Sequence, residues 1–342
     1  MRKLIVLFFT LSILSLLGCS NDPEESSPSR ENNGKASEQA IQNSVKEEVA
    51  TKKNVPNFNT FTYNGQVFEI IYFYQNFIDY VEKAKEQPDN LDELYMETVI
   101  NPLGGGDGQW ILQQWGFGTP TRPALLDKYL QSLIENHDTI KDLIINALKD
   151  SADQLQPGVT KYVYVLPANP DDAFTLRRNE GVAGAAWDQS FMTIQIAPPF
   201  LKESNLKFSV AHEYHHTVFF ENKKFAMDDS LLDFVLVEGK ADTFARIIYP
   251  EIQTPWSDFS TGKDEIQTWQ VLQKNVSSTD SLIKDLFFLG DGVKGLPRWA
   301  NYKIGNKIME SFIDENTNVS ITDWTNMSSD EVLEKSKYSE KH

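Results

Sequence analysis

The sequence predicts an α+β fold in which a small sheet packs on one functional helix and the rest of the chain is predominantly helical. Short segments rich in β-branched and aromatic residues lie near Lys161–Leu166 and Met192–Ala197, as expected for strands. Helical periodicity dominates from Tyr72 to about residue 153 and again beyond residue 250. The third observation is the run His212-Glu213-Tyr214-His215-His216, whose spacing places side chains on one face of a helix.

The first 18 residues have the composition of a bacterial signal peptide. Met1-Arg2-Lys3 is basic, and the apolar stretch from Leu4 to Leu17 is short for a membrane span. The run Leu16-Leu17-Gly18-Cys19 resembles a bacterial lipobox. That resemblance implies cleavage before Cys19, attachment of a diacylglyceryl lipid to its thiol, and a lipid-anchored, extracytoplasmic position at the bacterial cell membrane. An ordinary signal peptide cut elsewhere is the alternative.

Residues 19–55 are expected to form the lipidated start of the mature chain and a disordered tether. The segment is rich in Ser, Glu, Asn and Lys and contains no aromatic residue. Cys19 is the single cysteine, so no disulfide can form within the domain. The net charge of −17 argues against nucleic-acid partners and against electrostatic adhesion to anionic lipid, and it is compatible with basic peptides.

Residues 56–155 are expected to be a mostly helical N-terminal region that opens with a β-hairpin. Two strand-like segments flank Asn64-Gly65, a dipeptide typical of tight hairpin turns. Helical periodicity then includes a long segment from Ala124 to Leu148. His137 lies among polar neighbours and is expected in a solvated loop or at a helix cap.

The HExxH run indicates a metal site. His212 and His216 are four positions apart, so on a helix both imidazoles project from one face and can bind one Zn²⁺. Glu213 would stand beside the open coordination position, where a general base is needed. His215 is three positions from His212 and is the alternative partner. The i,i+4 spacing with Glu213 between the histidines favours His216, which leaves His215 a supporting or purely structural role.

A catalytic zinc site has three protein ligands and one open position, so a third ligand is needed. A metzincin would have Gly and His where this chain has Phe219 and Asn222. Glu238 follows His216 by 238 − 216 = 22 residues, enough for a turn and an antiparallel return helix. Asp242 lies one turn beyond Glu238, where it can accept the free N–H of a ligating histidine.

Both predicted helices have recognisable ends. Ser204 or Asn205 can cap the motif helix, and Ser230 can cap the helix that follows. Pro250 ends the pattern of that second helix. A further regular helical stretch runs from Leu296 to Ile313.

The motif and the run Glu238-Gly239-Lys240-Ala241-Asp242 resemble the gluzincins, HExxH peptidases whose third zinc ligand is a glutamate in an ExxxD context. Residues 160 to 315 are also similar to the predicted zinc-dependent protease domains of bacterial lipoproteins, of the YjaZ type. The shared features are a strand at Tyr162–Val165, the segment Gly181–Gly184, the HEYHH helix, the run at Glu238 and the segment Leu296–Gly305. The resemblance implies a zincin-like metalloprotease domain in residues 156–342, one zinc ion per chain, and a peptide or protein substrate.

Such a site predicts a mechanism. Zinc lowers the pKa of its water toward about 7, and Glu213 removes the proton as the water attacks a peptide carbonyl. The oxyanion needs a hydrogen-bond donor, for which Tyr302 is the first candidate, followed by Arg246 and Tyr249. The alternative for Tyr302 is an ordinary tyrosine of the core or helix surface beside Trp299.

The remaining inferences concern the substrate and the alternative functions. Ala185-Ala186-Trp187 is expected to form the rim along which an extended substrate lies, although an ordinary strand has the same pattern. The sequence lacks the Gly-x-Met-Glu-Asn element of large aminopeptidases, which favours an endopeptidase. A zinc ion that only joins two helices is one alternative, but such sites are usually closed and rich in thiolates. A non-catalytic lipoprotein that binds peptide or metal in a protease-like cleft is another, and it gives Glu213 no role.

Overall fold

A computed structural model describes residues 55–341 of the chain, apart from residues 107, 115, 157 and 224–227. The expected signal peptide and Cys19 lie outside the described residues, as does the expected tether apart from Val55. In the described segments, no helix combines the length and the apolar character that a membrane crossing requires.

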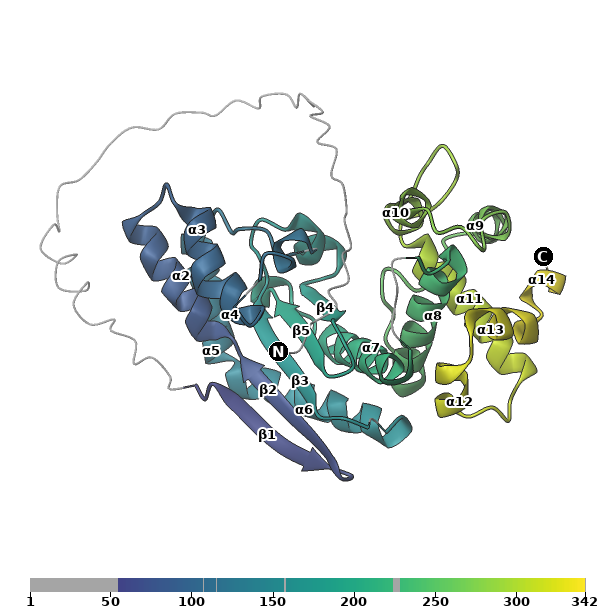
Figure 1. The fold of residues 1–342 in the computed structure, drawn as a ribbon, viewed down its shortest axis with the longest axis horizontal. Coiled ribbons are helices and arrows are strands. Elements are labelled where there is room, and N and C mark those ends of the chain that lie inside the picture. The colour runs from purple at the N-terminus through teal and green to yellow at the C-terminus, as the bar shows by residue number, and fades with distance from the viewer. Residues whose placement is uncertain (1–54, 107, 115, 157, 224–227, 342) are drawn as a thin grey trace, which may run out of the picture. The chain divides into compact units, whose positions relative to one another are not determined.

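The fold is α+β, as predicted, with one five-stranded sheet (Figure 1). The strands are β1 (Phe58–Tyr63), β2 (Gln66–Tyr72), β3 (Lys161–Pro167), β4 (Val182–Ala186) and β5 (Phe191–Ile196). Their order in the sheet is β1-β2-β3-β5-β4. Strands β2, β3 and β5 are parallel, whereas β1 and β4 run antiparallel to their neighbours. Strand β4, which contains most of the expected substrate rim, is therefore an edge strand.

The hairpin predicted around Asn64-Gly65 is confirmed. Strands β1 and β2 pair with Tyr63 opposite Gln66, which leaves a turn of two residues. Both turn residues have positive φ angles, 48° at Asn64 and 81° at Gly65, as a type I′ turn requires. The Asn-Gly dipeptide therefore sets the register of the first two strands.

The helices lie between β2 and β3 and, in a second group, after β5. The first group is α2 (Tyr74–Glu86), α3 (Leu91–Tyr95), η1 (Met96–Ile100), α4 (Asn101–Leu103), η2 (Ile111–Gln113), α5 (Pro123–Glu135) and α6 (His137–Gln154). The π-helical turn η3 (Phe174–Arg178) lies between β3 and β4, and η4 (Pro198–Phe200) follows β5. The second group is α7 (Glu203–Asn222), α8 (Leu231–Ile248), α9 (Gly262–Gln273), α10 (Ser281–Leu289), α11 (Ala300–Glu315), α12 (Ile321–Asn326), α13 (Ser329–Ser336) and α14 (Tyr338–Lys341).

Two boundaries in the first group differ from the prediction. Tyr72 ends β2, where it pairs with Val165 of β3, and the first helix starts only at Tyr74. The segment of helical periodicity from Ala124 to Leu148 is divided between two helices, which are separated at Asn136. Strand pairing and a helix break, which depend on the tertiary fold, override the local periodicity here.

His137 is buried, so the expected solvated position is wrong. It is the first residue of α6, and its side chain packs edge-on against Tyr72 with ring centroids 4.3 Å apart. The packing of α6 against the end of β2 thus removes from water a histidine whose neighbours in the chain are polar.

Helix α7 carries the HExxH motif through the interior. It packs against β4 and β5, and it also contacts α6 and α8 (Figure 1). Tyr214, inside the motif, donates its hydroxyl to the carbonyl of Leu155 at 2.6 Å, and its ring lies 6.4 Å from that of Phe68. The motif helix is therefore held on the sheet side by the core of the N-terminal region.

The predicted helix caps have different outcomes. The expected cap at Ser204 or Asn205 is wrong, because α7 already begins at Glu203 and has no side-chain cap. The cap of α8 at Ser230 is confirmed: its side chain accepts from the backbone N–H of Asp233, whose carboxylate accepts from the Ser230 N–H in a capping box.

Helices α8 and α11 pack closely because a glycine of each faces the other helix. A Cβ on Gly239 would lie 2.5 Å from the backbone of Gly305, and one on Gly305 would lie equally close to the carbonyl oxygen of Val235. This approach brings Tyr302 of α11 to the side of α8 that carries Glu238.

Helix α11 begins at Ala300 and not at Leu296 as predicted. Leu296 exchanges two backbone hydrogen bonds with Asp291 in an isolated β-bridge. Trp299 then takes the left-handed conformation, with φ of 57°, directly before the helix. The turn closed by this bridge therefore sets the start of the helix that carries Tyr302.

Candidate metal centre

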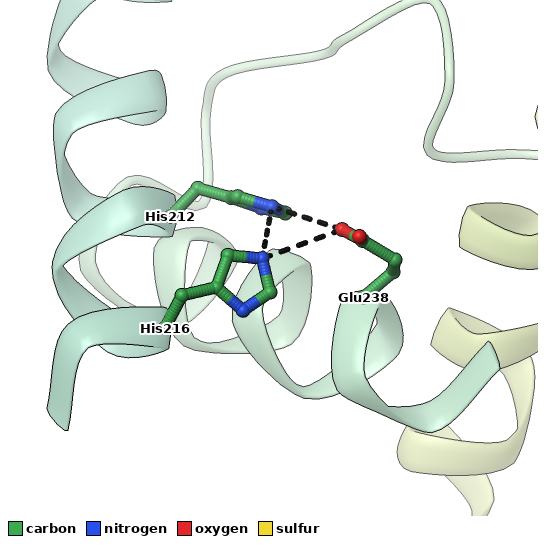
Figure 2. A group of neighbouring side chains, drawn as sticks. All are labelled: His212, His216 and Glu238. Atoms are coloured by element: carbon green, nitrogen blue, oxygen red, sulfur yellow. Dashed lines mark hydrogen bonds and ion pairs between the residues drawn. The ribbon is translucent and has the colours of Figure 1, made fainter. Parts of the chain in front are cut away.

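Three side chains converge where α7 meets α8, as Figure 2 shows. Nε2 of His212 lies 3.0 Å from Nε2 of His216 and 3.2 Å from Oε2 of Glu238, and Nε2 of His216 lies 3.4 Å from the same oxygen. Tetrahedral coordination with bonds of about 2.0–2.1 Å places neighbouring ligand atoms roughly 3.3–3.4 Å apart. The three residues predicted as metal ligands are thus brought together with the spacing that one zinc ion needs.

The charges around these atoms favour a cation. Burial would lower the pKa of His212, but hydrogen bonds to Asp242 and Glu238 and the charge of Glu213 raise it to about 10. Burial would raise the pKa of Glu238, but the charges and hydrogen bonds of His216 and His212 hold it far below its usual value. A proton on an imidazole therefore balances the carboxylates, and a divalent cation can take its place.

Asp242 lies behind His212, fully buried, with its Oδ1 3.4 Å from Nδ1 of the imidazole. The same carboxylate accepts hydrogen bonds from the indole of Trp256 at 2.9 Å, the hydroxyl of Ser257 at 3.2 Å and the amide of Asn306 at 2.7 Å. Sequence reasoning missed these three donors, which fix the carboxylate. Trp256 and Ser257 lie beyond the end of α8 and Asn306 lies on α11, so no local pattern could have connected them to the site.

Glu213 faces strand β4 and lies beside the ligand group. Its carboxylate accepts a hydrogen bond from the backbone N–H of Ala186. The Glu213 side chain fits beside Gly184 because this residue has no side chain: a Cβ at that position would collide with Glu213. Burial raises the pKa of Glu213 above its usual value, in the direction that suits a general base near neutral pH.

Tyr302 lies against the same group of residues. Its ring stacks on the imidazole of His212, with centroids 5.9 Å apart and planes inclined by 29°. Burial, the charges of Glu238, Glu213 and Asp242, and a hydrogen bond to Glu238 raise the pKa of Tyr302 well above its usual value. The hydroxyl therefore stays protonated, as a hydrogen-bond donor to an oxyanion must be.

The other two candidates for the oxyanion donor have partners elsewhere. Arg246 lies 3.3 Å from Glu310, and the hydroxyl of Tyr249 donates to Asp150 of α6 at 2.8 Å. Of the three candidates, Tyr302 is the one whose described contacts include a residue of the metal site.

His215 points away from the ligand group. Its Nε2 lies 3.2 Å from the hydroxyl of Thr325, and its ring stacks on Trp324 with centroids 5.5 Å apart. Burial, together with the positive charges of His216 and Lys240, lowers the pKa of His215 well below its usual value. His215 is therefore a neutral core residue between α7 and α12.

Comparison with known proteins agrees with this geometry. The family model described as "Predicted Zn-dependent protease (DUF2268)" matches residues 140–334, more than half of the chain. The chain is also 23% identical over 172 residues to YjfC of Bacillus subtilis (strain 168), itself described as uncharacterized; the match covers 47% of this chain and 57% of that relative. No solved structure matches the chain. The chain belongs to the family of predicted Zn-dependent proteases.

Proposed function

We propose that the chain is a peptidase that hydrolyses peptide bonds with one zinc ion held by His212, His216 and Glu238. The observation that carries the proposal is the spacing of the three ligand atoms, 3.0 to 3.4 Å, with Glu213 beside them. A zincin-like arrangement of residues 156–342, with a sheet edge and the Glu238 helix flanking the motif helix, is part of this proposal.

Zinc bound here would supply a Lewis acid and a water molecule of lowered pKa. Glu213 acts as the general base and later returns the proton to the leaving amine. The N–H of Ala186 and the space left by Gly184 keep its carboxylate at the strand side of the site. Asp242 holds His212 with Nε2 directed toward the ligand group.

Tyr302 donates its hydroxyl hydrogen to the oxyanion that forms on the substrate. Two observations support this role. The tyrosine ring is fixed on His212, and the neighbouring carboxylates keep its hydroxyl protonated. The close contact of Gly239 with Gly305 holds α11 near enough to α8 for this placement.

The substrate binds as an extended strand beside β4. This is supported by the position of β4 at the edge of the sheet and by the contact of its residue Ala186 with Glu213. A chain bound along a strand edge can continue past the site in both directions. The proposed enzyme is therefore an endopeptidase, in keeping with the missing aminopeptidase element.

The lipobox-like sequence at Leu16–Cys19 supports a lipid anchor. In this proposal, residues 1–18 are removed, Cys19 carries the lipid, and residues 19–55 tether the enzyme at the outer face of the bacterial cell membrane. Mass spectrometry of the mature chain would find an acylated Cys19 at its N-terminus, and an intact Met1 would contradict the anchor.

The decisive test of activity compares the full chain, in detergent and loaded with zinc, with its Glu213→Gln variant. We expect cleavage of a mixed peptide library that a chelator abolishes and that falls about 10²- to 10⁴-fold in the variant, which keeps its zinc. A folded, zinc-loaded wild type that cleaves nothing would contradict the proposal and favour a binding protein.

A further inference from the structure

Arg298 lies over a pair of aromatic rings, and a second arginine, Arg178, approaches it from a distant part of the chain. The guanidinium carbon of Arg298 lies 5.6 Å from the ring centroid of Phe174 and 5.9 Å from that of Trp299. Arg178 follows Phe174 by four residues in the π-helical turn η3 and so lies on the same side of that turn. Burial lowers the pKa of Arg298, and the positive charge of Arg178 lowers it further.

These two arginines differ from others in the chain. Arg122 pairs with Asp171, and Arg246 pairs with Glu310 at 3.3 Å. Among the residues that the structure describes, no carboxylate lies within ion-pair distance of Arg178 or of Arg298. In a chain with 49 acidic residues against 32 basic ones, two adjacent guanidinium groups without a carboxylate are conspicuous. Their mutual repulsion and the partial burial of Arg298 disfavour the arrangement unless an anion joins it.

The pair lies near the metal centre. Arg298 is four residues before Tyr302, whose ring stacks on His212, so at most about 14 Å of chain separates these two residues. Trp299 is also packed against Trp256, the residue that donates to Asp242. The π-helical turn η3, which carries Arg178, leads through a turn into the edge strand β4. An extended peptide advances about 3.3 Å per residue, so about four residues of substrate would span that length.

We infer that Arg178 and Arg298 form a subsite that binds a carboxylate of the peptide substrate. The subsite rests on the proposed peptidase function and adds a substrate class to it, namely peptides with an acidic group a few residues from the cleaved bond. Planar guanidinium groups match a carboxylate with paired hydrogen bonds, and the aromatic faces of Phe174 and Trp299 orient Arg298 for this contact.

The positive charge of these two arginines is opposite in sign to the net charge of the whole molecule. The net charge of −17 is compatible with basic peptides. The ligand that binds at one subsite, however, is decided by the charged groups within a few ångströms of it. The carboxylate can come from an Asp or Glu side chain or from the C-terminus of the substrate. The two sources share one chemistry, and the choice of peptides separates them.

The test measures binding, so it does not depend on turnover. The full chain with Glu213→Gln, loaded with zinc, is equilibrated with mixed peptides that have either a free or an amidated C-terminus, and the bound peptides are quantified by mass spectrometry. Selected peptides are then compared with partners in which Glu is replaced by Gln. The same measurement is made with Arg298→Gln, Arg178→Gln, the charge-preserving Arg298→Lys, and Arg177→Gln, an exposed neighbour in η3 that serves as the matched control.

We expect one acidic position, or the free C-terminus, to strengthen binding about tenfold over its neutral partner. Arg298→Gln and Arg178→Gln should each remove most of this preference, whereas Arg177→Gln should keep it and Arg298→Lys should keep part of it. Equal binding of acidic and neutral partners, or a preference that survives Arg298→Gln, would overturn the subsite. If acidic peptides bind through the arginines but the wild type cleaves none of them, the subsite stands and the peptidase proposal fails.

Discussion

His212 and His215 lie three residues apart on α7, and both are buried, yet their surroundings give them opposite properties. Carboxylates of α8 raise the pKa of His212 to about 10, in spite of its burial. Burial among Trp324, Phe244 and other core groups lowers the pKa of His215 well below its usual value. Burial alone therefore does not make a histidine a metal ligand; the charges that neighbouring helices bring to it decide.

The two sides of α7 face different kinds of side chain. On the metal side, Glu238 and Asp242 are held in place by hydrogen bonds from imidazole, indole and amide groups. On the other side, His215 meets a hydroxyl and aromatic rings. Of these two sides, the metal side has the carboxylates that can balance the charge of a cation. Substitutions on that side should therefore remove zinc, whereas substitutions on the His215 side should only weaken the fold.

The largest effect should come from the ligands themselves. His216→Ala or Glu238→Ala removes one of three ligands, and we expect such variants to hold less than stoichiometric zinc after dialysis against a weak chelator. His215→Ala should retain one zinc per chain and instead lose about 2–4 kcal/mol of unfolding free energy, since it leaves a cavity in the core. Metal analysis and urea unfolding of the same samples make the comparison. Zinc loss in His215→Ala with full zinc in His216→Ala would reverse our assignment.

Tyr302→Phe comes next. Removing one oxyanion donor typically costs about 10²- to 10³-fold in kcat, and the ring that stacks on His212 is kept. We expect kcat to fall by that factor while zinc content and KM change little. Tyr249→Phe is the matched control, because its hydroxyl is bound to Asp150 on another helix. Similar kcat values for the two variants would leave Tyr302 as a packing residue.

Asp242→Asn tests the group behind the ligand. A carboxylate that accepts from a ligating imidazole fixes its orientation and basicity, and its loss usually weakens metal binding about 10- to 100-fold. We expect a loss of that size in competition titrations with a zinc chelator. Asp233→Asn, on the same helix but bound to Ser230 and Ser329, should leave zinc affinity unchanged. An Asp242→Asn chain with wild-type affinity would show that the carboxylate serves only the fold.

The two histidines should also respond to pH with opposite signs in zinc-free protein. His215 has a lowered pKa in the fold, so the unfolded chain takes up its proton first, and its contribution to stability is lost as the pH falls below about 6.5. His212 has a raised pKa, so its contribution is present below about 6.5 and is lost as the pH rises through about 10. Each group changes stability by at most about 1.4 kcal/mol per pH unit.

Urea unfolding at several pH values checks these signs. Relative to wild type, His215→Phe should cost less stability at pH 5 than at pH 7, whereas His212→Phe should cost less at pH 10.5 than at pH 7. Parallel pH curves for the two variants would mean that the surroundings of the two histidines do not differ as described.

Much of this site was predictable because its ligands follow local rules. The i,i+4 spacing of His212 and His216 works on any helix, and Ser230 caps the helix that returns with Glu238. The turn at Asn64-Gly65 is likewise determined by its own two residues, which favour the positive φ angles that it needs. These features depend on a few neighbouring residues, so they can be inferred without knowing the tertiary fold.

The features that sequence reasoning missed depend on distant contacts. Trp256 and Asn306 reach Asp242 from other segments, and Gly184 has its function only because α7 places Glu213 against β4. His137 was expected in solvent because its neighbours are polar, but the packing of α6 on β2 buries it. Tertiary placement, rather than residue type, decides each of these.

The most direct test of the central claim is anomalous diffraction at the zinc edge from crystals of the zinc-loaded protein. We expect one anomalous peak per chain, about 2.0–2.2 Å from Nε2 of His212, Nε2 of His216 and a carboxylate oxygen of Glu238. A peak bonded to His215, or zinc bound without contact to Glu238, would contradict the account.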